Sequence, residues 1–185
     1  MTEQVIQDQA MLKAKFQDLY TSVNLSPTQL NLGDVDRLVQ MLKGADSHFP
    51  AQITFEITEN KLIEDQGQVV QDAITRLKLC GARLAIDDFG TGYSNIAYLQ
   101  RLDVDQLKLD QLFIKGLAQG KPIDQLVDSL IDFGERIGLT IIAEGIETET
   151  QYQYLKARGV HYGQGWLFSR PLPLTEFERF LQANR

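Results

Sequence analysis

Apolar and polar residues alternate along this chain with two different periods. Short runs with a period of two, typical of β-strands, recur along the sequence. Between them, apolar residues recur every three or four positions, as on one face of a helix. The predicted strands are TSVNLS (21–26), ITFEIT (53–58), RLAIDD (83–88), DQLKLD (105–110), LTIIAEG (139–145) and the stretch around VHYGQGWLF (160–168).

Amphipathic helix patterns separate these strands. Gly81, Gly138 and Gly159 stand where helix C-termini are expected, and Thr175 with Glu178 predicts a capping box for the last helix. The apolar stripes are Val35, Leu38, Val39 and Leu42; Val69, Val70, Ala73, Ile74 and Leu77; Leu126, Val127, Leu130 and Ile137; and Tyr152 with Leu155.

Repeated strand-then-helix units predict an α/β fold in which helices cover parallel strands. Neighbouring side chains of a strand point to opposite faces, so Ile53, Phe55 and Ile57 should face the helices and Glu56 the other side. No linker rich in Pro, Gly and Ser divides the chain, so residues 1–185 are expected to form a single domain.

Polar residues end every predicted strand. In parallel strands these ends share one rim, as in (β/α)8 barrels, whereas an open doubly wound sheet gathers ligands at one switch point. A complete barrel takes about 250 residues, so we expect an incomplete TIM-like barrel of about six units with two strands missing. The strand-end residues are Asn24, Glu56, Asp87, Asp88, Lys108, Glu144 and Gln164.

These strand ends are rich in oxygen ligands suited to Mg²⁺, Mn²⁺ or Ca²⁺. The adjacent carboxylates of Asp87 and Asp88 would repel each other unless cations offset their charge, and Lys108 adds a positive charge suited to a phosphate oxygen or a water. The set suits attack of water on a phosphodiester assisted by two metal ions. Alternatively, the Asp pair is a helix cap with a solvated charge, and Lys108 is a surface lysine.

Composition narrows the choice further. The net charge of −7 disfavours binding to nucleic acid polymers or acidic membranes. No run is apolar enough to span a membrane and the N-terminus does not resemble a signal peptide, so we expect a cytoplasmic protein. Cys80 is the only cysteine, and His48 and His161 are the only histidines, so any metal site must use oxygen ligands.

Several long segments resemble, in order, the signature motifs of the EAL family of bacterial cyclic di-GMP phosphodiesterases. The resemblance extends from about Glu3 to the C-terminus. It implies a TIM-like barrel that binds two Mg²⁺ or Mn²⁺ ions and cleaves cyclic di-GMP to linear pGpG. The segments are SVNLSP, FEITEN, AIDDFGTGYSN, DQLKLDQLFI, IIAEGIETETQ and GQGWLFSRPLP.

The resemblance also implies roles for individual residues. Asn95 stands where the family usually has a second serine, a change expected to matter little. Asn24, Glu56 and Asp87 resemble ligands of the first metal, Asp87 and Asp88 ligands of the second, Lys108 the lysine near the attacking water, Glu144 the general base or second-metal partner, Glu147 and Gln164 supporting residues, and Glu59 the anchor of the loop at 89–95.

The chain departs from the family pattern at its start. Family members begin with two antiparallel strands, the second carrying the Glu-Ala-Leu glutamate, a first-metal ligand, whereas TEQVIQDQAMLKAKF resembles the helix before VNLS. We therefore expect a weakened first-metal site. Losing even a residue that only orients a metal ligand lowers metal affinity or activity by about 10- to 100-fold. The exposed strand edges should be covered by a second copy, which we rank first, by a partner chain or by a rearranged N-terminal helix.

The leading hypothesis is thus a cyclic di-GMP phosphodiesterase domain with little or no activity alone. The alternatives are a module that binds cyclic di-GMP without cleaving it, or a protein-interaction surface. A phospho-receiver domain also uses an acidic pair and a lysine, but its pair would follow the first strand, whereas Asp87 and Asp88 end the third.

Overall fold

The computed structural model describes residues 1–185 except 45–47, 60–67, 91–102, 119, 121 and 185. The strands are β1 (Thr21–Asn24), β2 (Ile53–Thr58), β3 (Arg83–Phe89), β4 (Gln106–Leu109), β5 (Thr140–Glu144) and β6 (Tyr162–Gln164). The α-helices are α1 (Thr2–Lys13), α2 (Leu32–Lys43), α4 (Gln68–Leu79), α6 (Gln111–Lys115), α7 (Pro122–Arg136), α8 (Glu149–Ala157) and α9 (Leu174–Ala183), with 3₁₀ turns η1 (Pro27–Gln29) and η2 (Pro50–Gln52).

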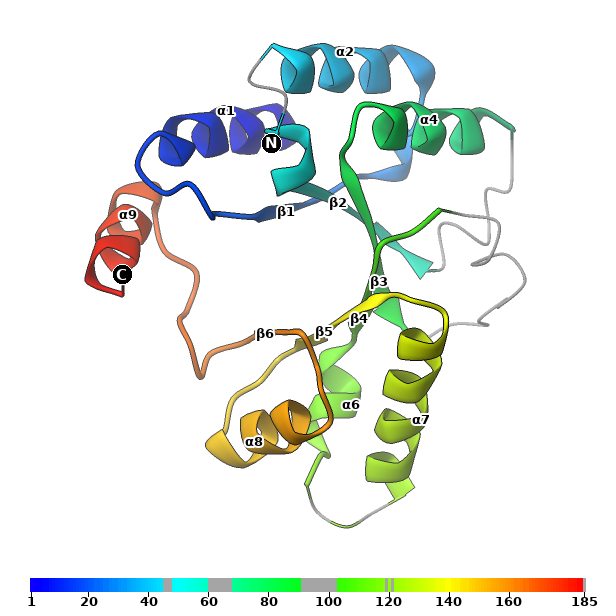
Figure 1. Ribbon diagram of the computed structural model, residues 1–185, viewed down its shortest axis with the longest axis vertical. Coiled ribbons are helices and arrows are strands. Elements are labelled where there is room, and N and C mark those ends of the chain that lie inside the picture. The colour runs from blue at the N-terminus through cyan, green and yellow to red at the C-terminus, as the bar shows by residue number, and fades with distance from the viewer. Residues whose placement is uncertain (45–47, 60–67, 91–102, 119, 121, 185) are drawn as a thin grey trace.

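The strands form one parallel sheet in the order β1-β2-β3-β4-β5-β6. A doubly wound sheet reverses its strand order, whereas this order follows the chain, as in a TIM-like barrel. Figure 1 shows the sheet curled, with β1 and β6 as its two edges. The fold is therefore a curled half-barrel of six parallel strands with alternating helices, as predicted.

The convex face of the sheet carries the hydrophobic core. Ile53, Phe55 and Ile57 of β2 are buried in the cluster formed with the covering helices, while Glu56 points to the opposite, concave face. This confirms the predicted alternation in β2. The same alternation puts Leu107 and Leu109 of β4 in the core and Gln106 and Lys108 on the concave face.

The helix ends were predicted with mixed success. Gly81, Gly138 and Gly159 follow helices with φ of 94°, 79° and 78°, a left-handed conformation that glycine adopts without strain. The predicted capping box of Thr175 and Glu178 is wrong. Helix α9 begins earlier, at Leu174, after an N-cap residue, Pro173, that has no capping side chain.

A capping box does occur in α8. The Thr148 side chain accepts from the Gln151 amide, and the Gln151 side chain accepts from the Thr148 amide. The predicted strand at 160–168 is also shorter than expected and covers only Tyr162–Gln164. It stops where Gly165 lies against the backbone of Ile146, too close for any side chain.

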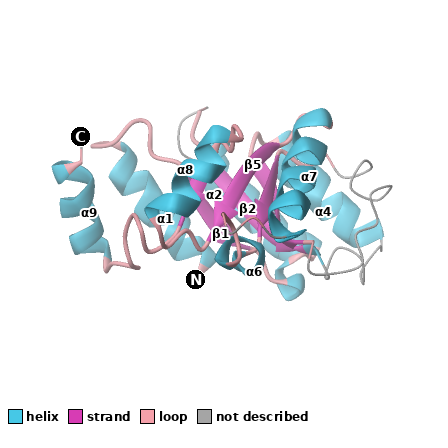
Figure 2. Cartoon of the chain, turned by 90° about the horizontal axis from the view of Figure 1, so that it is seen from below, coloured by secondary structure: helices cyan, strands magenta, loops and turns pink. Residues whose placement is uncertain are grey.

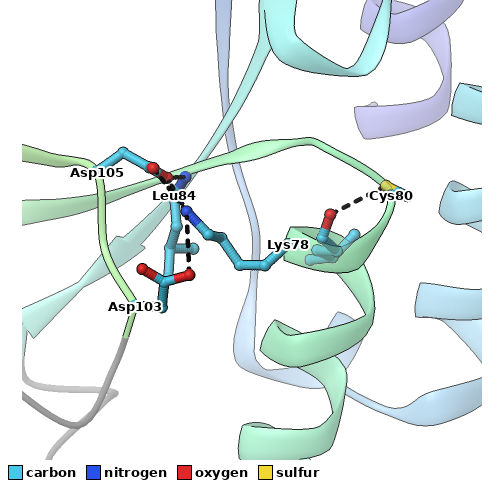
Figure 3. Close-up of polar contacts among 6 residues, drawn as sticks. Lys78, Cys80, Leu84, Asp103 and Asp105 are labelled. Atoms are coloured by element: carbon cyan, nitrogen blue, oxygen red, sulfur yellow. Dashed lines mark hydrogen bonds and ion pairs between the residues drawn. The ribbon is translucent and has the colours of Figure 1, made fainter. Parts of the chain in front are cut away.

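Asp105 sets the register of the sheet at its N-terminal side (Figure 3). Its carboxylate accepts hydrogen bonds from the Leu84 amide at 2.7 Å and from Lys78 Nζ at 2.6 Å. Its main-chain N–H donates to the Leu84 carbonyl, and its carbonyl accepts from the Thr140 amide, both at 3.0 Å. One residue thus ties α4, β3, β4 and β5 together and fixes how far each strand reaches toward the opposite rim.

Helix α9 lies beside the segment that follows α1, on the side of the molecule where β1 and β6 end the sheet (Figure 1). An extended segment after β6 leads to it, and Figure 2 shows the helix at one end of the molecule. Among the described residues, no helix is both long enough and apolar enough to cross a membrane.

Candidate functional site

Lys108 is the centre of an ion-pair cluster built from four neighbouring strands. Its Nζ lies 2.8 Å from Glu56 Oε1 on β2 and 3.0 Å from Asp87 Oδ1 on β3. On its other side, on β5, the carboxylate of Glu144 lies at 2.5 Å. The strands are parallel, so residues from distant parts of the sequence meet at the C-terminal rim, as the strand ends predicted.

This cluster is largely shielded from water. Lys108, Glu56 and Asp87 are only 3%, 6% and 8% exposed. Burial by itself lowers the pKa of Lys108, but the carboxylates of Glu56 and Glu144 outweigh it and raise the pKa well above its ordinary value. Lys108 is therefore a fixed positive charge throughout the physiological pH range, and not a surface lysine.

The rim carries more negative than positive charge. Burial raises the pKa of Glu144 above its ordinary value, against the opposing effect of Lys108, and Asp87 adds to the rise. Burial also raises the pKa of Asp88, and the neighbouring carboxyls of Asp110 and Asp87 add to it. A bound cation would relieve this excess charge.

A bulge explains how the consecutive residues Asp87 and Asp88 face the same site. Side chains normally alternate along a strand, but the pairing of β3 with β4 shifts register between Ile86 and Phe89. Asp88 lies within this shift with a φ of 56°, in the left-handed region that few residues other than glycine adopt, and its amide donates to Asp87 Oδ1 at 3.0 Å.

Asp87, Asp88 and Glu144 fit a divalent cation. Each offers a carboxylate oxygen, and the three oxygens lie within 4.8 Å of one another. Carboxylates are ligands preferred by Mg²⁺ and Mn²⁺. We searched the described residues for groups of three or more Asp, Glu, His or Cys side chains close enough to hold one ion, and these three carboxylates form such a group.

Asn24 and Glu59 lie on the β1 and β2 side of the rim. Asn24 is the register partner of Glu56, and both line a cavity of about 390 Å³. Glu59 is buried and accepts a hydrogen bond from the amide of Gly90, 3.0 Å away. The loop that Glu59 was predicted to anchor continues to Asn95, beyond the described residues.

Gln164 and Glu147 lie on the β5 and β6 side. Gln164 is the register partner of Glu144, and its carbonyl accepts from the Ile146 amide at 3.0 Å. Glu147 is exposed. The side chains of Glu144, Glu147 and Gln164 line a cavity of about 610 Å³, which Trp166 and Arg170 also line.

Asp110 belongs to the same rim but was not among the predicted site residues. It caps the N-terminus of α6 by accepting from the Leu112 amide at 2.6 Å, it is 8% exposed, and its side chain hydrogen-bonds with that of Asp88. The signal was present in the sequence, since Asp110 directly follows β4 as Asp87 and Asp88 end β3.

The chain forms a curled half-barrel of parallel strands, with carboxylates and one buried lysine at the strand ends. These features define a TIM-like barrel domain with a candidate metal site. More narrowly, the chain belongs to the EAL domain family, whose model matches residues 1–171. This confirms the family resemblance found in the sequence motifs.

Individual relatives agree with this assignment. The chain is 36% identical over 168 residues to a probable cyclic di-GMP phosphodiesterase, PdeB of Escherichia coli, a match that covers 89% of this chain and 31% of that protein. The structure is similar to the PaMucR phosphodiesterase in complex with c-di-GMP, with a TM-score of 0.85 and 32% identity over 95% of this chain and 71% of that one.

Another similar structure contains a metal. It is the manganese/cy-diGMP complex of BlrP1 from Klebsiella pneumoniae, with a TM-score of 0.77 and 30% identity over 89% of this chain and 42% of that one. The chain thus spans less than a third of the length of the curated relative and less than half of BlrP1.

Proposed function

We propose that this chain is an EAL-type domain that binds cyclic di-GMP at the rim around Lys108, with two divalent cations, Mg²⁺ or Mn²⁺. The observation that carries the proposal is the convergence of Glu56, Asp87 and Glu144 on the buried Lys108, with Asp88 beside them. The relatives named as cyclic di-GMP phosphodiesterases and the solved complexes with that nucleotide support the choice of ligand.

The residues of the rim divide into two groups in this proposal. Asn24, Glu56 and Asp87 hold the first cation, and Asp87 with Asp88 holds the second. When bound, the cations lower the pKa of a water molecule and stabilise the leaving oxygen of the phosphodiester. Glu59 holds the amide of Gly90 and so orients the segment that follows Asp88.

Lys108 and Glu144 act on the reacting groups. The ammonium of Lys108 stays charged and attracts the phosphate and the attacking water. Glu144 either accepts the proton of that water or assists the second cation, and its raised pKa suits a proton acceptor. Glu147 and Gln164 support Glu144 from the adjoining cavity.

We further propose that the chain alone hydrolyses cyclic di-GMP weakly or not at all. Its sequence contains no Glu-Ala-Leu segment, and the glutamate of that segment is a first-metal ligand in the family pattern. The second candidate function is a module that binds the nucleotide, or a protein, without catalysis. A second copy or a partner chain covers the open barrel edge, and the protein acts in the cytoplasm.

One paired measurement tests these proposals. Calorimetry with cyclic di-GMP and Mn²⁺ or Mg²⁺ should detect binding at tens of micromolar protein, and product analysis should detect little or no pGpG. Asp88→Asn should weaken the cation-dependent binding, while Asp132→Asn, on the exposed face of α7, should not. Binding without pGpG supports the non-catalytic module, and rapid pGpG formation contradicts the low-activity proposal. Absence of heat contradicts the nucleotide site itself.

A further inference from the structure

The side chain of Gln151, in the first turn of α8, joins two segments that belong to different strand-and-helix units. Its Oε1 accepts hydrogen bonds from the amides of Glu147 at 2.9 Å and Thr148 at 3.0 Å. Its Nε2 donates to the carbonyl oxygen of Ile114, on α6, at 2.9 Å. One side-chain amide therefore holds the β5–α8 loop (residues 145–148) against α6.

Helix capping alone does not explain this arrangement. A capping box needs only an acceptor at this position, which glutamate or glutamine supplies, whereas the bond to Ile114 needs a donor. Gln151 is 7% exposed and Ile114 is fully buried, so water does not readily replace the bond if it is lost. Glutamine meets both needs, since its amide offers an acceptor and a donor at once.

The two joined segments both begin at residues of the rim. The β5–α8 loop directly follows Glu144, and α6 follows Lys108 by way of its N-cap residue, Asp110. The 2.5 Å ion pair between Lys108 and Glu144 spans the same two units. A change in the spacing between the loop and α6 would therefore shift Glu144 relative to Lys108.

A close backbone contact fixes that spacing from the other direction. Gly145 has a φ of 71°, in the left-handed region, and a Cβ atom there would lie only 2.5 Å from the Cβ of Gln111, the first residue of α6. The loop therefore cannot move closer to α6, and Gln151 keeps it from moving away. Together the two contacts hold the start of the loop, and with it Glu144, at one distance from α6.

Glu144 depends on this support more than the other carboxylates of the cation site. Asp87 and Asp88 are consecutive residues of β3, where strand pairing and the bulge hold both. Glu144 is the last residue of β5, two strands away, yet its carboxylate oxygen lies within 4.8 Å of theirs. Its place in the group thus depends on the segment that follows it.

We propose that Gln151 is a positioning residue of the cation site: by holding the β5–α8 loop against α6, it keeps the Glu144 carboxylate in place beside Asp87 and Asp88. Gln151 acts through Glu144 and not as a ligand, since both polar atoms of its side chain are engaged by the protein. The inference rests on the proposed function and adds to it a residue that lies outside the rim.

Titration with Mn²⁺ alone, followed by the paramagnetic resonance signal of the free ion, tests this role. Gln151→Leu removes the acceptor and the donor but keeps a side chain of similar size. We expect the dissociation constant for Mn²⁺ to rise about tenfold, as for residues that orient a metal ligand. Gln153→Leu is the matched control, because Gln153 is on the same helix, is exposed and donates to Glu149 within α8.

A double-mutant cycle with Glu144→Gln separates positioning from a general loss of structure. If Gln151 acts through Glu144, Gln151→Leu should not weaken Mn²⁺ binding any further once Glu144 has been replaced. A purely structural role would give the same fold-loss in both backgrounds. Circular dichroism at the titration temperature shows whether each variant is folded, so that the constants compare folded chains.

Gln151→Glu keeps the proposal testable even if Gln151→Leu fails to fold. Glutamate accepts from the same two loop amides and so preserves the capping box, but it cannot donate to the Ile114 carbonyl. It should weaken Mn²⁺ binding in the wild-type background and not in the Glu144→Gln background. Gln153→Glu, on the exposed face of α8, controls for the added charge.

The outcomes distinguish the role of Gln151 from the proposed function. Unchanged Mn²⁺ affinity in Gln151→Leu, or an equal loss in both backgrounds, would overturn the role of Gln151 and leave the cation site in place. No Mn²⁺ binding by the wild type, or binding that Asp88→Asn leaves unchanged, would overturn the proposed cation site and the role of Gln151 together.

Discussion

Lys108 and Glu144 form a 2.5 Å ion pair between the neighbouring strands β4 and β5, at the rim of the half-barrel. Burial acts on the two partners in opposite ways. It lowers the pKa of the lysine, which the surrounding carboxylates more than reverse, and it raises the pKa of the glutamate, which the lysine only partly opposes. The rim is therefore held together by one cation that several carboxylates share.

Replacing that cation should destabilise the domain. Lys108→Met leaves Glu56, Asp87 and Glu144 next to one another in a buried site without a compensating charge. Removing one partner of a buried ion pair costs about 3–5 kcal/mol, so we expect a loss of that size in urea unfolding with EDTA. Lys43→Met, on the exposed end of α2, is the control. A loss below that of the control would mean that the lysine does not hold the rim.

Glu144 should make stability depend on pH. Its folded-state pKa is raised above the ordinary value of 4.5, so its contribution is fully present below that value and is lost as pH rises through the folded pKa. Glu144→Gln removes this titration, and Lys108 stays charged throughout. The variant should therefore gain stability relative to the wild type as pH rises from 4.5 toward neutrality.

Urea unfolding at several pH values, with EDTA, measures this difference. Glu147→Gln serves as the control because Glu147 is exposed, and it should show no such trend relative to the wild type. A stability difference between Glu144→Gln and the wild type that stays constant with pH would contradict the prediction.

Asp105 should matter more for stability than its neighbour Asp103. Asp105→Ala removes the acceptor of the buried Leu84 amide and the close partner of Lys78. An unsatisfied buried group costs about 1–3 kcal/mol, and thermal or urea unfolding should show a loss in this range. The Asp103 carboxylate lies 3.7 Å from Lys78 and is 86% exposed, so Asp103→Ala should change little. Equal effects of the two variants would contradict the assigned role of Asp105.

Gly165 should not tolerate a side chain. A Cβ atom there would lie 2.1 Å from the Ile146 carbonyl oxygen and 2.3 Å from its nitrogen, both backbone atoms that cannot rotate away. Gly165→Ala should cost about 1–3 kcal/mol and disturb Gln164 and Trp166 beside it. Gly44→Ala is the matched control, because Gly44 has an ordinary φ of −70° and a Cβ atom there would make only ordinary contacts, the nearest 3.4 Å from the Gln40 carbonyl oxygen. Unchanged stability and Trp166 fluorescence in Gly165→Ala would show that the loop moves freely.

The sequence predicted the elements of this fold well where local pattern decides them. The strand ITFEIT was predicted with its observed bounds, and α1 occupies the N-terminal segment expected to be a helix. The strand predicted at 160–168 was too long. The observed strand ends at Gln164, where Gly165 packs against the backbone of Ile146, a contact that no local sequence pattern reveals. The capping box of α9 was predicted wrongly because the helix starts at Leu174, directly after Pro173. Thr175 therefore lies inside the helix and not at its N-cap.

The candidate site was predicted in part. Polar residues at strand ends are visible in the sequence, and the parallel order brings several of them to one rim. That Asp87 and Asp88 share a side depends on the bulge between Ile86 and Phe89, and the role of Asp110 depends on its contact with Asp88. Both are consequences of pairing between strands, so periodicity along one strand could not reveal them.

The sequence by itself determined the six strand-and-helix units, the oxygen-rich set of polar strand ends and the family, because these depend on local periodicity, residue type and ordered motifs. Only the tertiary structure decided that three carboxylates share Lys108 and that the concave face keeps the Gln106 side-chain oxygen without a donor. The reason is physical: ion pairing, burial and edge exposure depend on distances between segments far apart in the chain.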